Sequence, residues 1–138
     1  MTDASTGDEQ AHGSRPSSAT LHVLRITAMA SVLALVFQFV TAGQILAIGP
    51  SATALHGGVA IAIHIIFGLT VLAAAIHWRS QHGAVWPVMV VAVSFVLSFF
   101  QAHFGSTGAM SLHVPIAVVL TIGIVWVTAW SFTPGARH

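Results

Sequence analysis

Four long apolar runs, separated by short polar stretches, make up most of this chain. They cover about residues 23–48, 54–78, 85–104 and 111–132. Each run has at least the roughly 20 residues that an α-helix needs to cross the hydrocarbon core of a bilayer. Gly, Pro and Ser between the runs indicate turns. Because connections of only about six residues join antiparallel neighbours, the pattern predicts an all-α, integral membrane bundle of four helices with up-down-up-down topology.

The composition also favours an integral membrane protein over a soluble domain. Of the 138 residues, 56% are hydrophobic and 5% are charged, whereas soluble domains carry about a quarter charged residues. The formal net charge of +1 is too small for a nucleic-acid partner. The chain has no cysteine, which excludes disulfides, iron–sulfur clusters and thiolate-held zinc. Any metal would need histidine, methionine or oxygen ligands.

Polar segments flank the apolar region at both ends. Residues 1–21 hold all three acidic residues and show no hydrophobic periodicity, so we expect a disordered cytoplasmic tail and not a cleaved signal peptide. We expect residues 22–133 to form the membrane domain and residues 134–138 a short second tail. The positively charged residues all lie before or at the start of the first run, between the second and third, or after the fourth: Arg15, Arg25, Arg79 and Arg137. The positive-inside rule then predicts a bacterial plasma-membrane protein with both termini in the cytoplasm.

Polar side chains collect near the outer ends of the predicted helices. Counted at about 1.5 Å of rise per residue, His56, His103 and His113 lie nearest the outer surface. Gln44 and Gln101 lie at the next level. Polar and ionisable groups inside a membrane are candidates for function, so all five are candidate site residues.

The predicted bundle favours one pair among these histidines. The second and fourth helices of such a bundle are diagonal, which leaves room for a haem whose iron is held from both sides by His56 and His113. The third helix adjoins the second. We therefore expect His103 to hydrogen-bond a ligand or to replace one.

The remaining histidines have other interpretations. His64 lies near the midplane at the expected level of Gln38, where it could be a neutral imidazole hydrogen-bonded to that amide or a direct iron ligand. His77 and His82 lie at the inner boundary, and we expect them to be solvated or interfacial.

Four short motifs occupy the helix ends that carry these polar residues: VTAGQILA, LHGGVAIAIH, FVLSFFQAHFG and SLHVPIAVVL. Across about residues 25–132 they resemble one four-helix half of the haem A synthase family, and also small four-helix bacterial membrane proteins of unknown function. The resemblance implies a haem held by one histidine of the second helix and one of the fourth, here His56 and His113. The first helix lacks the acidic residues of the oxidising half of that family, which argues against haem A synthesis by this chain alone.

These observations lead to one main functional hypothesis and two alternatives. The main one is a haem b-binding membrane protein with a role in electron transfer or a haem-linked accessory role, and with a redox partner or complex subunit at the outer face. One alternative is copper handling by His56, His103, His113 and Met110, because imidazole and thioether groups suit Cu(I). The other is a cofactor-free structural or assembly subunit. The sequence shows no constellation for catalysis beyond redox chemistry.

Overall fold

The computed structural model describes residues 16–137, and this part of the chain is helical without β-strands. The long helices are α1 (Pro16–Ile48), α2 (Thr53–Gln81), α3 (Trp86–Ser106) and α4 (Met110–Ser131). Two short 3-10 helices follow α1 and α4, namely η1 (Pro50–Ala52) and η2 (Pro134–Arg137). All four long helices are long and apolar enough to cross a membrane. The predicted all-α fold class is confirmed.

The predicted helix ends agree with the structure except at the start of α1. This helix begins at Pro16 and not at about Val23, so residues 16–21 of the expected tail are helical. Proline is favoured in the first helical turn, and the extension buries Leu21. The expected disorder of residues 1–15 lies outside the described residues. At the other end, the expected short tail forms η2, whose Ala136 is fully buried.

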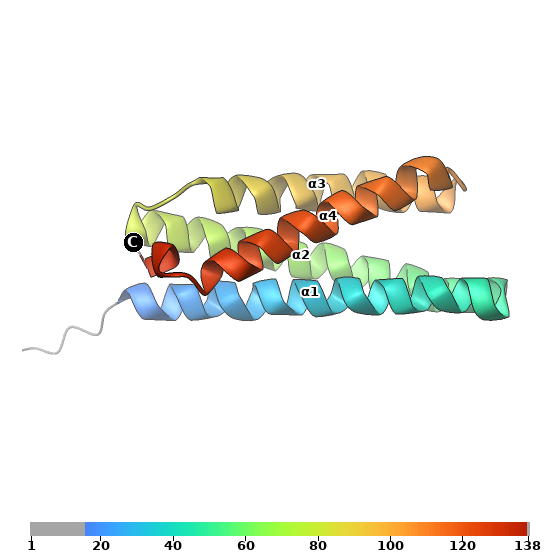
Figure 1. Ribbon diagram of the computed structural model, residues 1–138, viewed down its shortest axis with the longest axis horizontal. Helices are drawn as coiled ribbons and strands as arrows, with labels where there is room; N and C mark the ends of the chain where they lie inside the picture. The colour runs from blue at the N-terminus through green and yellow to red at the C-terminus, as the bar shows by residue number, and fades with distance from the viewer. Residues whose placement is uncertain (1–15, 138) are drawn as a thin grey trace, which may run out of the picture.

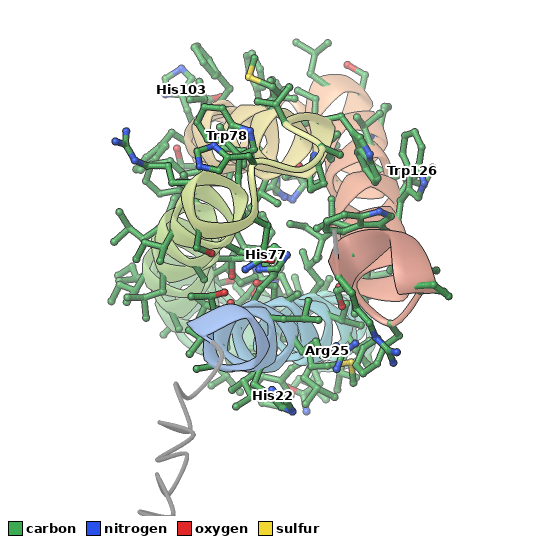
Figure 2. The ribbon with its side chains drawn as sticks, turned by 90° about the vertical axis from the view of Figure 1, so that its left-hand side faces the viewer. His22, Arg25, His77, Trp78, His103 and Trp126 are labelled. Carbon is green, nitrogen blue, oxygen red and sulfur yellow. The ribbon has the colours of Figure 1, made fainter. Side chains whose placement is uncertain are left out.

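The four helices lie along the long axis of the molecule, and α4 crosses the others obliquely (Figure 1). Helix α1 packs against α2 and α4, and α3 packs against the same two helices. The predicted diagonal arrangement of α2 and α4 is therefore confirmed. Figure 1 places the α1–α2 and α3–α4 connections at one end, which we call the histidine end. The α2–α3 connection and η2 lie at the opposite end, together with Arg25, which we call the arginine end (Figures 1 and 2).

An apolar core fills the middle of the bundle between these two ends. Its buried side chains come from all four helices: Leu35, Ile63, Phe67, Val91, Ile124 and Val127. One buried contact links α1 to α2, because the hydroxyls of Ser31 and Thr70 lie 3.0 Å apart. One hydroxyl donates to the other, and the accepting hydroxyl donates to a backbone oxygen of its own helix, at Thr27 or Ile66. Such hydroxyl pairs hold helices together where the surroundings cannot supply water.

His77 is buried at the arginine end, where it is only 4% exposed. Its Nε2–H donates to the backbone oxygen of Ala136 at 2.9 Å, and its Nδ1 lies 3.1 Å from the hydroxyl of Thr20. His77 is therefore not solvated, contrary to one of the two expectations for this residue. The N-terminal part of α1 and η2 cover this side chain, and neither segment was expected to fold onto the bundle. His82 is exposed, as expected.

Candidate functional site

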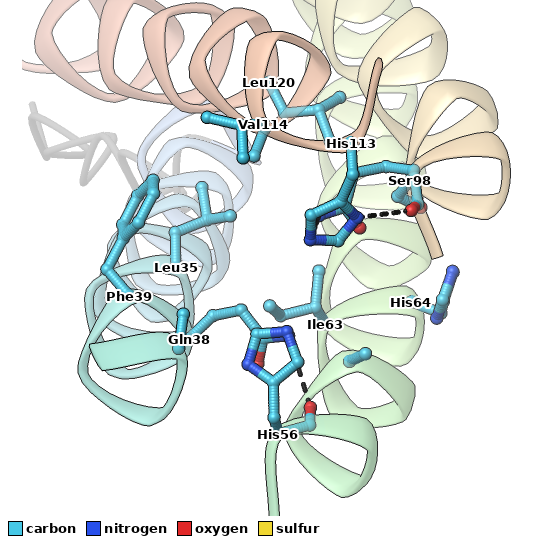
Figure 3. A pocket seen from close by; sticks show the side chains of 14 residues that line it. Leu35, Gln38, Phe39, His56, Ile63, His64, Ser98, His113, Val114 and Leu120 are labelled. Carbon is cyan, nitrogen blue, oxygen red and sulfur yellow. Dashed lines mark hydrogen bonds between the residues drawn. The ribbon is translucent and has the colours of Figure 1, made fainter. Parts of the chain in front are cut away.

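Two histidines from diagonal helices face each other near the histidine end. The ring centroids of His56 on α2 and His113 on α4 lie 6.3 Å apart, with 58° between the ring planes. Both side chains are half-buried. Figure 3 shows the two rings on opposite sides of a cavity between the helices. The structure thus brings together the two residues that the sequence placed at one level of the bundle.

Both ring nitrogens of His56 are hydrogen-bonded to α1. The hydroxyl of Thr41 donates to the backbone oxygen of Gln38 at 2.9 Å, so it accepts from His56 Nδ1–H at 3.0 Å. The other ring nitrogen, Nε2, therefore carries a lone pair. That lone pair accepts from the side-chain amide of Gln38 at 3.1 Å.

Both ring nitrogens of His113 are hydrogen-bonded to α3 in the same way. His113 Nδ1–H donates to the backbone oxygen of Gln101 at 2.7 Å, and Nε2 accepts from the side-chain amide of Gln101 at 3.2 Å. Gly105 makes room for this ring, since a Cβ at that position would lie 2.7 Å from His113 Cε1 and Nδ1. Only glycine allows the imidazole to lie so close to α3.

The two histidines therefore share one arrangement, in which the Nδ1–H is fixed and the Nε2 lone pair faces a side chain that can move. Histidines that ligate metals almost always donate their second ring N–H to a carbonyl or a comparable acceptor, which fixes the tautomer and the ring orientation. His113 meets this condition directly through Gln101. His56 meets it through Thr41, whose hydroxyl is itself held by Gln38. The donors available here are the Nε2 lone pairs of two neutral imidazoles.

Two adjoining cavities surround the histidine pair. The inner one has a volume of about 170 Å³ and the outer one, toward the histidine end, about 570 Å³. The outer volume lies within the roughly 300–1,000 Å³ typical of pockets for small molecules and cofactors. Both cavities are lined mainly by apolar groups and share four polar side chains besides Gln38: His56, His64, Gln101 and His113.

His64 lines both cavities but does not join the pair. Its ring packs on Phe99 with 4.3 Å between centroids, and its buried Nε2 has no hydrogen-bond partner. The expected hydrogen bond between His64 and Gln38 is absent, because the Gln38 amide is bonded to the side chain and the backbone oxygen of His56. That expectation was wrong.

Two of the predicted site residues lie outside the cavities. Gln44 and His103 are both exposed, and neither lines a cavity. His103 lies at the periphery of the bundle in Figure 2. Gln101, in contrast, lines both cavities. Thr41 and Gly105 were not predicted from the sequence, and neither was the contact between Gln38 and His56. The available signal was the spacing of Gln38 and Thr41, which are three residues apart and so share one face of α1.

A metal centre with three or more protein ligands is not assembled here. Within residues 16–137, the structure has no group of three or more His, Cys, Asp or Glu side chains that could hold a metal ion. The copper alternative required three histidines with Met110. Of these, His103 is exposed and lines neither cavity, while Met110 lines the outer cavity with His56 and His113.

No protein-family model, curated protein or solved structure matches this chain. The fold and the site define an all-α protein with four helices apolar enough to span a membrane and a histidine pair at one end. The resemblance to the haem A synthase family therefore stays a prediction.

Proposed function

We propose that this chain is a membrane protein that binds haem b, with His56 and His113 as the two axial ligands. The observation that carries the proposal is the 6.3 Å separation of the ring centroids. A metal–imidazole bond is about 2.0–2.1 Å and each nitrogen lies about 1.1 Å from its ring centre, so imidazoles on opposite sides of one metal have centroids about 6 Å apart. The pair already has the spacing that ligation of a single iron requires.

The surroundings of the pair also suit haem. The bound group would supply one-electron redox chemistry, and its potential would depend on the axial ligands, the hydrogen bonds to them and the burial of the site. Thr41 and the backbone of Gln101 orient the two imidazoles through Nδ1–H. Apolar side chains from three helices line the inner cavity and exclude water: Leu35, Ile63 and Leu120. If both His56 and His113 held the iron, the group would serve electron transfer and not reactions with oxygen.

We place this protein in a bacterial plasma membrane, as an up-down-up-down bundle with both termini in the cytoplasm. Three features of the arginine end support this orientation, namely Arg25 in α1, Arg79 at the end of α2 and Arg137 in η2. The described residues of the histidine end, 49–52 and 107–109, carry no charge. The histidine pair would then lie near the outer face, and the apolar core separates it from the cytoplasmic side. A redox partner or complex subunit at the outer face would exchange electrons with it.

A spectrum of the purified protein tests the proposal. Protein expressed with ample haem and purified in detergent should show the reduced bands of a low-spin haem with two histidine ligands. His56→Ala and His113→Ala should each lose these bands, whereas His103→Ala, at an exposed position, should keep them. Absence of haem bands from the unaltered protein after haem-replete expression would end the proposal.

A copper site is the second candidate, and one observation favours it. The thioether of Met110 lines the outer cavity together with His56 and His113, and these groups suit Cu(I). Copper that is retained through purification without haem bands, and lost in Met110→Leu, would support this alternative. Unchanged behaviour of the His56→Ala, His113→Ala double variant would instead indicate a cofactor-free subunit.

A further inference from the structure

We infer that Gln38 and Gln101 are displaceable caps on the two histidines and that the site loads in order, His113 before His56. Each glutamine amide bonds the Nε2 lone pair of its histidine, and the amide must leave before that nitrogen can ligate. The inference rests on the proposed function. It concerns the regulation of that site and adds two positioning residues to it.

The glutamine amide and a metal would compete for the same Nε2 lone pair at each histidine. The Gln38 amide lies 3.1 Å from His56 Nε2, and the Gln101 amide lies 3.2 Å from His113 Nε2. A neutral imidazole has one lone pair on its unprotonated nitrogen, and metals bind through that same lone pair. The amide hydrogen bond and a metal bond therefore exclude each other at both histidines.

Each glutamine side chain can rotate away from Nε2 while the histidine ring stays oriented through Nδ1–H. His113 Nδ1–H is held by the backbone oxygen of Gln101, and His56 Nδ1–H is held by Thr41, which is bonded to the backbone oxygen of Gln38. Rotation of either glutamine side chain leaves these backbone contacts in place. Each glutamine therefore orients its histidine through the main chain while its side chain controls access to Nε2.

The two glutamine amides differ in the number of hydrogen bonds that hold them. The Gln38 amide makes two hydrogen bonds, to His56 Nε2 and to the backbone oxygen of His56, and this side chain is 9% exposed. The Gln101 amide makes the single bond to His113 Nε2, and Gln101 is half-buried. Fewer bonds hold Gln101, so His113 becomes free to ligate first.

The hydrogen bonding of the Gln38 side chain is incomplete, which favours its rotation away from His56 when a ligand arrives. Its Oε1 is buried without a hydrogen-bond partner, an unfavourable state in the closed arrangement. The closed cap on His56 is therefore stable but incompletely satisfied.

Nitrogen-15 NMR of the histidine rings in the unloaded, detergent-solubilised protein tests the caps without any haem. We expect His56 and His113 both to carry the proton on Nδ1. Gln38→Leu should shift the Nε2 resonance of His56 alone, and Gln101→Leu that of His113 alone. Gln44→Leu, the same substitution at an exposed position of α1, should shift neither. A proton on Nε2 of either histidine, or unchanged resonances in the Leu variants, would overturn the inference.

Ligand titrations test the displacement. Removing a competing amide should tighten hemin binding, by about threefold for Gln101→Leu and about tenfold for Gln38→Leu, as one and two modest hydrogen bonds imply. Gln44→Leu should bind as the unaltered protein does. Hemin should also associate faster with His56→Ala, which keeps His113, than with His113→Ala. Equal or reversed rates would overturn the loading order.

Titration with Zn²⁺ separates this inference from the proposed function. If the unaltered protein takes up no hemin, the proposed function fails. Tighter Zn²⁺ binding in the two Leu variants, with the expected ring resonances, would still support the caps. If hemin binds but the Leu variants change neither its affinity nor the affinity for Zn²⁺, the caps are overturned and haem binding stands.

Discussion

His56 and His113 lie 6.3 Å apart between ring centroids, although α2 and α4, which carry them, are diagonal in the bundle. Direct helix packing does not hold the pair together. Instead, Thr41 on α1 holds the ring of His56 and the backbone of Gln101 on α3 holds that of His113. The geometry of the pair therefore depends on all four helices, and substitutions away from the two rings can alter it.

Gly105→Ala should damage the site without touching either ligand. The new methyl group would lie 2.7 Å from Cε1 and Nδ1 of His113, so the ring must move away from α3. This movement breaks the hydrogen bond from His113 Nδ1–H to Gln101, and loss of such a supporting contact weakens metal binding by about 10–100-fold. A hemin titration of the purified variant measures the change.

Gly43→Ala is the matched control for this prediction. A Cβ at Gly43 meets nothing within 4 Å, and the residue lies in the last third of α1. Alanine also has the better helix propensity, so this variant should bind hemin normally and unfold no more readily than the unaltered protein. Equal hemin affinity of the two alanine variants would show that the contact between Gly105 and His113 does not position the ring.

His64→Leu should keep the haem spectrum and should not reduce stability. The buried Nε2 of His64 has no partner, and an apolar replacement removes an unsatisfied polar group, which stabilises by about 1 kcal/mol. The loss of the ring contact with Phe99 offsets part of this gain. Thermal unfolding in detergent and the reduced spectrum provide the two measurements. Loss of the haem bands in this variant would identify His64 as an iron ligand.

His77→Ala should destabilise the bundle from the arginine end. The substitution leaves a cavity and removes the hydrogen bonds to Thr20 and Ala136, at a cost of about 2–4 kcal/mol in the free energy of unfolding. His103→Ala, at an exposed position, should stay within about 0.5 kcal/mol of the unaltered protein. Denaturant unfolding in mixed micelles compares the two. Equal stabilities would mean that η2 does not depend on His77 for its position.

The sequence was sufficient to locate the helices and the pairing of His56 with His113. Runs of spanning length with Gly and Pro between them restrict where helices can end. Short connections make neighbours in sequence neighbours in space, so α2 and α4 are diagonal. Two histidines at similar distances from the same end of diagonal helices could therefore be paired without coordinates.

The partners of His56 could not be predicted by counting residues. The prediction began the second helix at about Ala54, but Gly49, with a φ of 81°, turns the chain so that η1 starts at Pro50. His56 therefore lies about 10 Å along the chain axis from the turn, and not about 3–4 Å. Its side chain contacts that of Gln38. Gln44, six residues further along α1, is turned by roughly 120° around the helix and is exposed.

The hydroxyls of Ser31 and Thr70 should be energetically coupled. They lie 3.0 Å apart in the apolar interior, where water cannot replace the contact. One hydroxyl donates to the other, which donates to the backbone of its own helix at Thr27 or Ile66. A double-mutant cycle with Ser31→Ala and Thr70→Val should give a coupling free energy of about 0.6 kcal/mol and at most about 1.7 kcal/mol, the range for hydrogen bonds between membrane helices. Thr121→Val is the control, because its hydroxyl bonds only Ala117 of its own helix. Its effect should add to that of Ser31→Ala within about 0.3–0.5 kcal/mol. If the effects of Ser31→Ala and Thr70→Val on the free energy of unfolding are also additive, the contact between the two hydroxyls does not stabilise the packing of α1 against α2.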